Sequence, residues 1–176
     1  MRLARWAVLS SLCMGLVLTG AARAEVKVEL KGVHLCCGNC VKTVGAILKD
    51  VEGVQGKCDQ KAKTVTITAP DAKTAQKALD ALAAGGFHGD TGQKDVAIKD
   101  DSGAVKGKVK SVTVTGIHDC CNNCNKSVKE AVKKVNGVQA DTAKAKSNTF
   151  EVTGDFDAAE LVKALNAAGF HVKVKK

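Results

Sequence analysis

The chain has 176 residues, of which 45% are hydrophobic and 26% charged, and its formal net charge is +9. This is ordinary globular composition with room for one or two small domains. We exclude a nucleic-acid-binding protein because the lysines are scattered along the chain and only 3% of residues are aromatic, which leaves almost no side chains for base stacking.

Residues 1–24 have the pattern of a secretory signal. Arg2 and Arg5 precede an apolar run at 7–18, which is too short to span a bilayer, and Ala22-Arg23-Ala24 forms an A-x-A cleavage site. We therefore predict cleavage after Ala24, a periplasmic or secreted location, and no stable membrane insertion of the mature chain.

The next residues alternate between apolar and polar side chains, and then change to helical spacing. Val26, Val28 and Leu30 predict a first strand, and apolar residues from Val41 to Val51 predict a helix. The pattern continues with a helix end at Gly53, short strands near 54–58 and 64–68, a second helix capped by Asp71 and ending at Gly85, and a last strand from Phe87.

The same order of elements returns in the rest of the chain. Residues 34–54 align with residues 118–138 without a gap, and 11 of these 21 positions are identical. The repeat predicts a strand around Val112 and Val114, a helix from Val128 to Val135 ended by Gly137, strands near 138–144 and 149–153, a helix capped by Asp157 and ending at Gly169, and a last strand from Phe170. We predict an α+β protein of two tandem ferredoxin-like βαββαβ sandwiches, at residues 25–90 and 109–176, joined by a polar linker at 91–108.

Cysteines gather in the repeated loop, which reads H-x-C-C-x-x-C in both units. An odd number of cysteines follows residue 24, which does not fit a complete disulfide framework in an exported protein. Thiolates are soft ligands for Cu(I), Zn(II) or Hg(II), and a CxxC pair at a helix start brings two of them onto one ion. The candidate metal ligands are Cys37, Cys40, Cys121 and Cys124, then Cys36 and Cys120, then His34 and His118.

Three further residues have two interpretations each. His88 and His171 precede the last strand of each unit, where an imidazole either binds the metal or orients a thiolate, or simply lies exposed on a strand. Cys58 has no counterpart in the second unit, and we interpret it as a small buried hydrophobic residue rather than as a reactive thiol.

A CxxC pair that follows the first strand of a βαββαβ unit and opens its first helix resembles the heavy-metal-associated (HMA) domain. That family includes copper chaperones, modules of copper-transporting ATPases and the periplasmic mercury-binding protein. The resemblance rests on Cys37–Cys40 and Cys121–Cys124, on Gly-Val at 53–54 and 137–138, and on Gly-Phe at 86–87 and 169–170. The family's buried methionine is replaced by Leu35 and Asp119, and the extra cysteine and histidine of each loop are departures.

These observations favour a non-enzymatic, exported Cu(I) chaperone, buffer or metal-resistance protein with one thiolate-rich site per repeat. Zn(II) or Hg(II) are alternative ions, and a protein that donates or accepts the metal is the expected partner. A thiol-disulfide redox protein and a pair of Cys3His structural zinc sites remain as alternative functions. The sequence leaves open whether the two loops act separately or share a cluster.

Overall fold

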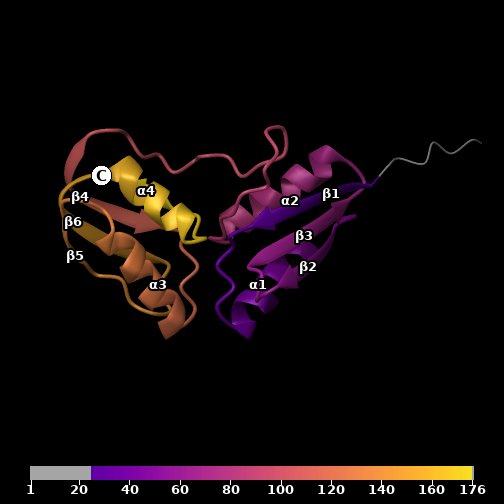
Figure 1. The fold of residues 1–176 in the computed structure, drawn as a ribbon, viewed down its shortest axis with the longest axis horizontal. Helices are drawn as coiled ribbons and strands as arrows, with labels where there is room; N and C mark the ends of the chain where they lie inside the picture. Colours follow the sequence, from indigo (N-terminus) through magenta and orange to yellow (C-terminus); the bar gives the residue numbers. More distant parts are fainter. Residues whose placement is uncertain (1–24, 176) are drawn as a thin grey trace, which may run out of the picture.

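The structure is a computed structural model that describes residues 25–175, so the predicted signal at 1–24 lies outside the described residues. Across the described range, no helix is long and apolar enough to cross a membrane. The chain forms a mixed α/β fold with two antiparallel sheets, divided between an N-terminal half at 25–90 and a C-terminal half at 108–175 (Figure 1).

The N-terminal half contains a three-stranded sheet in the order β1-β3-β2. Val28 and Leu30 of β1 and Ile67 of β3 are fully buried, because alternate residues of these strands face the two helices of this half. Its elements are β1 (Val26–Lys31), α1 (Gly38–Lys49), β2 (Gln55–Asp59), β3 (Thr64–Ala69) and α2 (Ala72–Ala84).

The C-terminal half contains a four-stranded sheet in the order β5-β6-β4-β7, which is the split βαβ arrangement of ferredoxin-like proteins. Val112 of β4 pairs with Val152 of β6, and both side chains are buried against α3 and α4. Its elements are β4 (Lys108–Thr115), α3 (Asn122–Lys133), β5 (Val138–Asp141), β6 (Thr149–Asp157), α4 (Ala158–Ala167) and β7 (Lys173–Lys175).

The helix starts predicted from aspartates are confirmed. The Asp71 carboxylate accepts a hydrogen bond from the Thr74 amide, and Asp157 accepts one from the Ala159 amide, each at 2.8 Å. The first helix of each half ends earlier than predicted, at Lys49 and Lys133, and a turn separates this end from the glycine that was expected to terminate it.

The predicted last strand of the N-terminal half is absent from the described chain as a regular strand. Phe87 instead forms an isolated bridge with Phe170 of the C-terminal half, and Asp90 forms one with Lys31. The backbone after α2 is therefore used to contact the other half, which leaves too few residues to pair along β1. In the C-terminal half the last strand starts at Lys173 rather than at Phe170.

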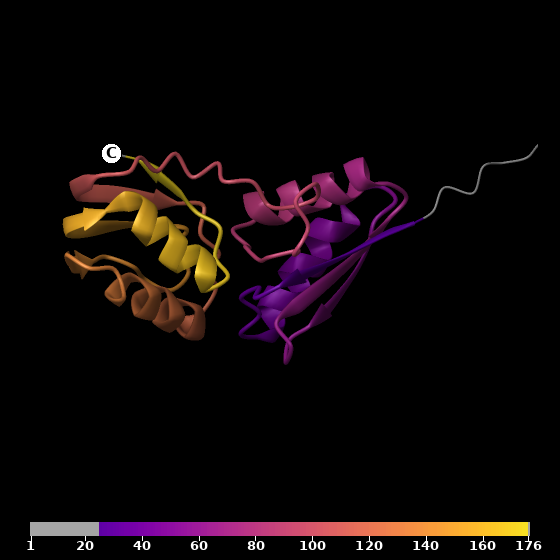
Figure 2. The same cartoon turned by 45° about the horizontal axis from the view of Figure 1, so that its top comes forward.

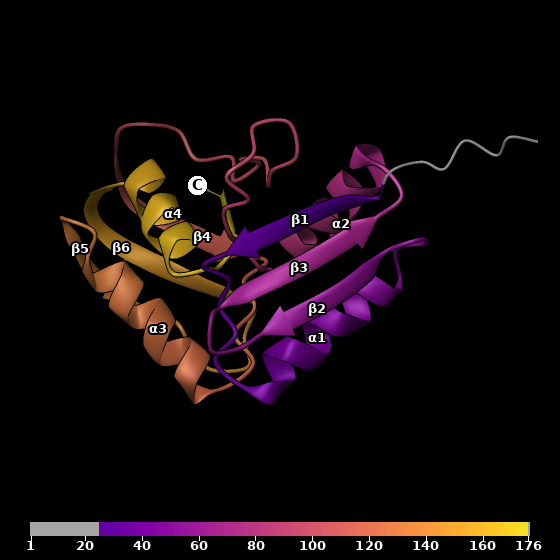
Figure 3. The same ribbon diagram turned by 45° about the vertical axis from the view of Figure 1, so that its right-hand side comes forward.

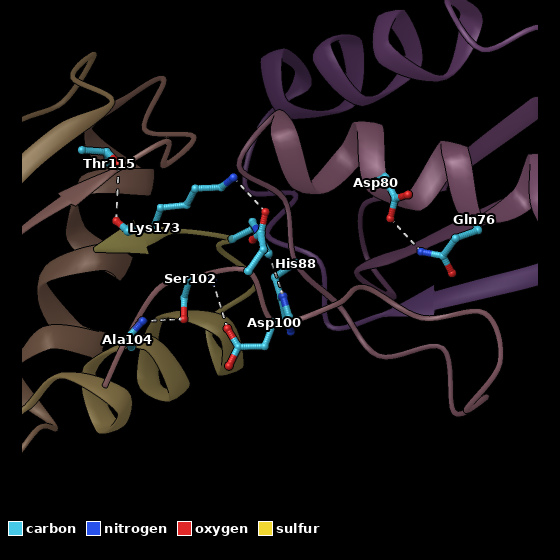
Figure 4. A network of polar contacts seen from close by, with 10 residues as sticks. Gln76, Asp80, His88, Asp100, Ser102, Ala104, Thr115 and Lys173 are labelled. Atoms are coloured by element: carbon cyan, nitrogen blue, oxygen red, sulfur yellow. Dashed lines mark hydrogen bonds and ion pairs between the residues drawn. The ribbon is translucent and has the colours of Figure 1, made fainter. Parts of the chain in front are cut away.

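The segment between the halves contains no helix or strand at residues 91–107, yet it is packed against both halves (Figures 2 and 4). Gln76 of α2 exchanges two hydrogen bonds with the backbone of Ala97. Ser102 is buried, and its carbonyl accepts a hydrogen bond from the Val174 amide of β7 at 2.8 Å.

The two halves meet through a pair of equivalent backbone contacts. The His88 amide donates to the Gly169 carbonyl, and the His171 amide donates to the Gly86 carbonyl, each at 3.0 Å. Because each contact has its counterpart from the other repeat, the halves are related by an approximate two-fold axis. The repeated cysteine loops, which open α1 and α3, are brought to the same side of this contact (Figure 3).

Candidate metal centre

Each cysteine motif is wrapped around the start of a helix. Cys37 is the N-cap of α1 and Cys121 the N-cap of α3, both with extended backbone and no side-chain capping hydrogen bond. Cys40 and Cys124 follow in the first turn and are fully buried. The free amides and partial positive charge of a helix N-terminus favour the thiolate form of cysteines in this position.

The two loops bring their six sulfur atoms together in one place. The shortest sulfur–sulfur contact between the halves joins Cys36 Sγ to Cys124 Sγ at 3.3 Å, and Cys40 Sγ lies 3.9 Å from Cys124 Sγ. Within each loop the CxxC sulfurs are 3.7 Å apart. We name this set, Cys36, Cys37, Cys40, Cys120, Cys121 and Cys124, the sulfur cage. The sequence leaves open whether the loops act separately or share a cluster, and the contact between the halves places them face to face.

The cage combines buried and accessible sulfurs. Cys40 and Cys124 have no exposed surface, whereas the other four cysteines are only half-buried. An incoming ion or a partner's thiolate therefore has a route to the cage, while the helix starts fix the inner sulfurs.

Protons are distributed unevenly over the cage. A hydrogen bond from Cys124 lowers the pKa of the Cys40 thiol, and the same contact raises the pKa of Cys124. The Cys124 amide lowers the pKa of Cys121 to about 7, while burial raises the pKa of Cys120 to about 12. Six thiolates so close together repel one another, so the metal-free cage retains part of its protons and a cation has to displace them.

The two motif histidines lie beside the cage and against the opposite half. His34 stacks on Phe170 with ring centroids 4.2 Å apart, and His118 packs on Phe87 at 4.4 Å. A ring nitrogen of His34 lies within 4.8 Å of the Cys36 and Cys124 sulfurs. Burial lowers the pKa of His34, which favours the neutral imidazole that binds metals. The Nε2 atoms of His34 and His118 are buried and have no hydrogen-bond partner within residues 25–175.

His88 and His171 face each other instead of the cage. Their Nδ1 atoms are 3.3 Å apart and their rings are stacked, and His171 Nε2 is 2.7 Å from the Asp101 carboxylate. Asp101 also pairs with Lys173 at 2.8 Å. His171 is buried, so it is not the exposed strand residue of the alternative interpretation. No local sequence pattern indicates the contact of Asp101 with His171, 70 positions away.

Leu35 and Asp119, which lie within the two cysteine loops, are both buried. Asp119 Oδ2 accepts a hydrogen bond from Asn125 at 2.9 Å, and burial raises the pKa of this carboxyl group. Cys58 lies half-buried on β2, less buried than the sequence predicts, and burial raises the pKa of its thiol.

The burial of His88, together with its contact to His171, gives the fold a specific dependence on pH. Burial, followed by the proximity of His171, lowers the pKa of His88 from 6.5 to about 4, against a smaller opposing effect of Asp100 and Asp90. Between these values the unfolded chain binds a proton that the folded chain does not, so stability falls as the pH falls, by at most about 1.4 kcal/mol per pH unit.

We expect His88→Asn to reduce this slope between pH 6.5 and pH 4. The measurement is urea unfolding of the reduced, metal-free protein and of the variant at several pH values. All other titrating groups are common to both proteins, so the difference between their free energies of unfolding reports the loss of His88 together with its contact to His171. A difference that stays constant across this range would contradict the prediction.

Comparison with known proteins agrees with this chemistry. Residues 111–171 match the heavy-metal-associated domain family. The matched range includes His118 and the whole C-terminal cysteine motif. No curated protein sequence matches the chain. Together, the family match and the cysteine clusters support the binding of heavy-metal ions.

Two solved structures are similar over most of the chain. One is the solution structure of the N-terminal soluble domains of Bacillus subtilis CopA, with 16% identity, 87% of this chain and 95% of that chain covered, and a TM-score of 0.34. The other is the water-soluble region of the P-type ATPase CopA from Bacillus subtilis, with 17% identity, 87% and 93% covered, and a TM-score of 0.29.

Proposed function

We propose that the protein is an exported, non-enzymatic Cu(I) chaperone or buffer, built from two tandem HMA-like domains that bind the metal between them. The observation that carries the proposal is the convergence of six cysteine sulfurs from the two repeats, with contacts of 3.3 to 3.9 Å. So many thiolates in one place suit a soft ion such as Cu(I), whose positive charge offsets part of their repulsion. The predicted signal segment supports a periplasmic or secreted location.

The accessible outer sulfurs support transfer of metal by ligand exchange. Cys37 and Cys121 are half-buried at the helix starts, so a thiolate of a donor or acceptor protein can replace one of them on the ion. This exchange needs no general base and no substrate pocket, so we propose no catalytic residue.

The two alternative functions are less compatible with the arrangement. A redox pair requires two thiols that react chiefly with each other, whereas Cys40 Sγ lies within 3.9 Å of sulfurs from both halves. A structural zinc site is typical of domains without a sufficient core. Here each half has its own buried aromatic and aliphatic side chains, such as Leu79 and Phe156.

The test is a competition between Cu(I) and Zn(II) for the reduced chain, starting at Glu25, followed anaerobically by native mass spectrometry. We expect Cu(I) to displace Zn(II), and the variant with Cys37→Ala and Cys121→Ala to lose most of the bound copper. Cys58→Ala serves as the matched control and retains it. Zinc that resists copper and is required for folding would favour the structural function. A chain that binds neither ion but re-forms a Cys37–Cys40 disulfide in air would favour redox chemistry.

A further inference from the structure

The six sulfurs of the cage have a regular geometric arrangement. Each sulfur of the cage lies within 4.8 Å of four others, two from its own loop and two from the opposite loop. This neighbour pattern is that of an octahedron made of two facing triangles, one from each cysteine motif.

Four alternate faces of such an octahedron are defined by the sulfur contacts. In three of these faces, all three sulfurs lie within 4.8 Å of one another. In the fourth face, the three sulfur–sulfur distances are 3.7, 3.3 and 3.9 Å. The first three faces are Cys36-Cys37-Cys121, Cys37-Cys40-Cys120 and Cys120-Cys121-Cys124, and the fourth is Cys36-Cys40-Cys124. Each cysteine belongs to two of these four faces.

The faces have the size of a three-coordinate metal site. A metal–thiolate bond of about 2.3 Å places the three sulfurs of a trigonal site about 4.0 Å apart. Nine of the twelve sulfur–sulfur distances are 3.3 to 3.9 Å and the other three are within 4.8 Å, so only small adjustments bring each face to that edge length.

From this geometry we propose that the cage holds four Cu(I) ions as a single cluster, each bound by three sulfurs, with each sulfur bridging two ions. The inference rests on the proposed function, because it assumes Cu(I) as the ion. The reaction is balanced: four monovalent ions enter, the cysteines release the protons that the metal-free cage still holds, and the filled cage of six thiolates carries a charge of −2. No electron is transferred.

Charge favours the filled cage over a partly filled one. Two Cu(I) ions with six thiolates would leave a charge of −4 in a half-buried site, whereas four ions leave −2. His34, beside the Cys36-Cys40-Cys124 face, has a buried Nε2 without a partner among residues 25–175, and is placed to orient a sulfur of that face.

The test counts copper in the reduced chain by native mass spectrometry and detects copper–copper pairs by X-ray absorption. We expect metal-free and four-copper species to dominate during the titration, with a copper–copper scattering path. Each cysteine closes two faces, so Cys36→Ala should lower the capacity from four ions to two and remove most of that path. Cys58→Ala is the control that keeps four.

The outcomes separate this inference from the proposed function. If Cu(I) binds at one ion per CxxC pair, with two per chain, and Cys36→Ala leaves that number unchanged, the cluster is disproved while the copper-binding function stands. If the chain binds no Cu(I), both fail. A luminescence measurement on the Cu(I)-loaded chain gives a second readout, since solvent-shielded Cu(I)–thiolate clusters emit light and isolated two-coordinate ions do not.

Discussion

Replacing Gly86 with alanine is expected to separate the two halves, open the sulfur cage and reduce the copper capacity from four ions to two, while each half stays folded. Gly86 belongs to the N-terminal half, but a Cβ built on it would lie 2.4 Å from the His118 amide nitrogen and 2.5 Å from the Gly116 carbonyl oxygen. These are backbone atoms of the opposite loop, which have no flexible end to move aside.

The same close approach occurs at the equivalent position of the other half. A Cβ on Gly169 would lie 2.3 Å from the His34 amide nitrogen, so Gly169→Ala should have the same effect. Both glycines are next to the Phe87–Phe170 bridge and supply the carbonyls that hold the halves together. A methyl group at either glycine would therefore disrupt the contact between the halves and leave the core of each half unchanged.

Gly53→Ala is the matched control, because Gly53 has φ +77° and Gly86 has φ +83°. Both substitutions place an L side chain in the left-handed region, at a similar cost of about 1 to 2 kcal/mol. The nearest atom to a Cβ on Gly53 is a Pro70 side-chain carbon of the same half, at 3.4 Å. We expect this control to keep four ions. Small-angle scattering would report the separation of the halves. If Gly86→Ala keeps a compact shape and full copper capacity, the shared cage is refuted.

The local elements of this fold are visible in the sequence because short-range patterns determine them. The alternation at Val26, Val28 and Leu30 gives β1, and Asp71 caps α2 where the pattern places it. The CxxC spacing correctly predicts that two sulfurs of each motif flank a helix start, because N-cap and first-turn positions are set by local geometry.

The meeting of the two loops is not encoded in any local pattern. It depends on contacts between residues more than 80 positions apart, such as Cys36 with Cys124 and His88 with His171. Gly86-Phe87 and Gly169-Phe170 were recognised only as family positions near the metal loop. In the structure each phenylalanine packs on the motif histidine of the opposite half. Each glycine, which lacks a Cβ, allows the backbone of the opposite half to approach closely. The same contact explains why residues after Phe87 do not continue as a strand.

Loading the protein with Cu(I) should raise its unfolding temperature by at least about 8 °C and merge the unfolding of both halves into one transition. An ion that binds only the folded state stabilises it by about 4 kcal/mol when its free concentration is 1,000 times its dissociation constant. For a chain of this size, 1 kcal/mol corresponds to roughly 2–4 °C.

The two unfolding transitions should merge because single ions are bound by cysteines of both halves. In the Cys37-Cys40-Cys120 face, one ion is held by sulfurs of both halves, so unfolding of either half releases it. Calorimetry of the metal-free and the copper-loaded chain measures both effects. Cys58→Ala should show the full shift, and Cys121→Ala, which opens two of the four faces, should show a smaller one.

Two separate transitions in the loaded protein, each shifted by its own amount, would contradict a shared cage and indicate one site in each half. The metal is therefore expected to act as the strongest link between the repeats, because the protein contacts between them are three backbone hydrogen bonds, the stacks that involve the four histidines, and the packed segment at 91–107. A chaperone that releases copper to a partner would loosen this link as it unloads, which couples the emptying of the cage to exposure of its sulfurs.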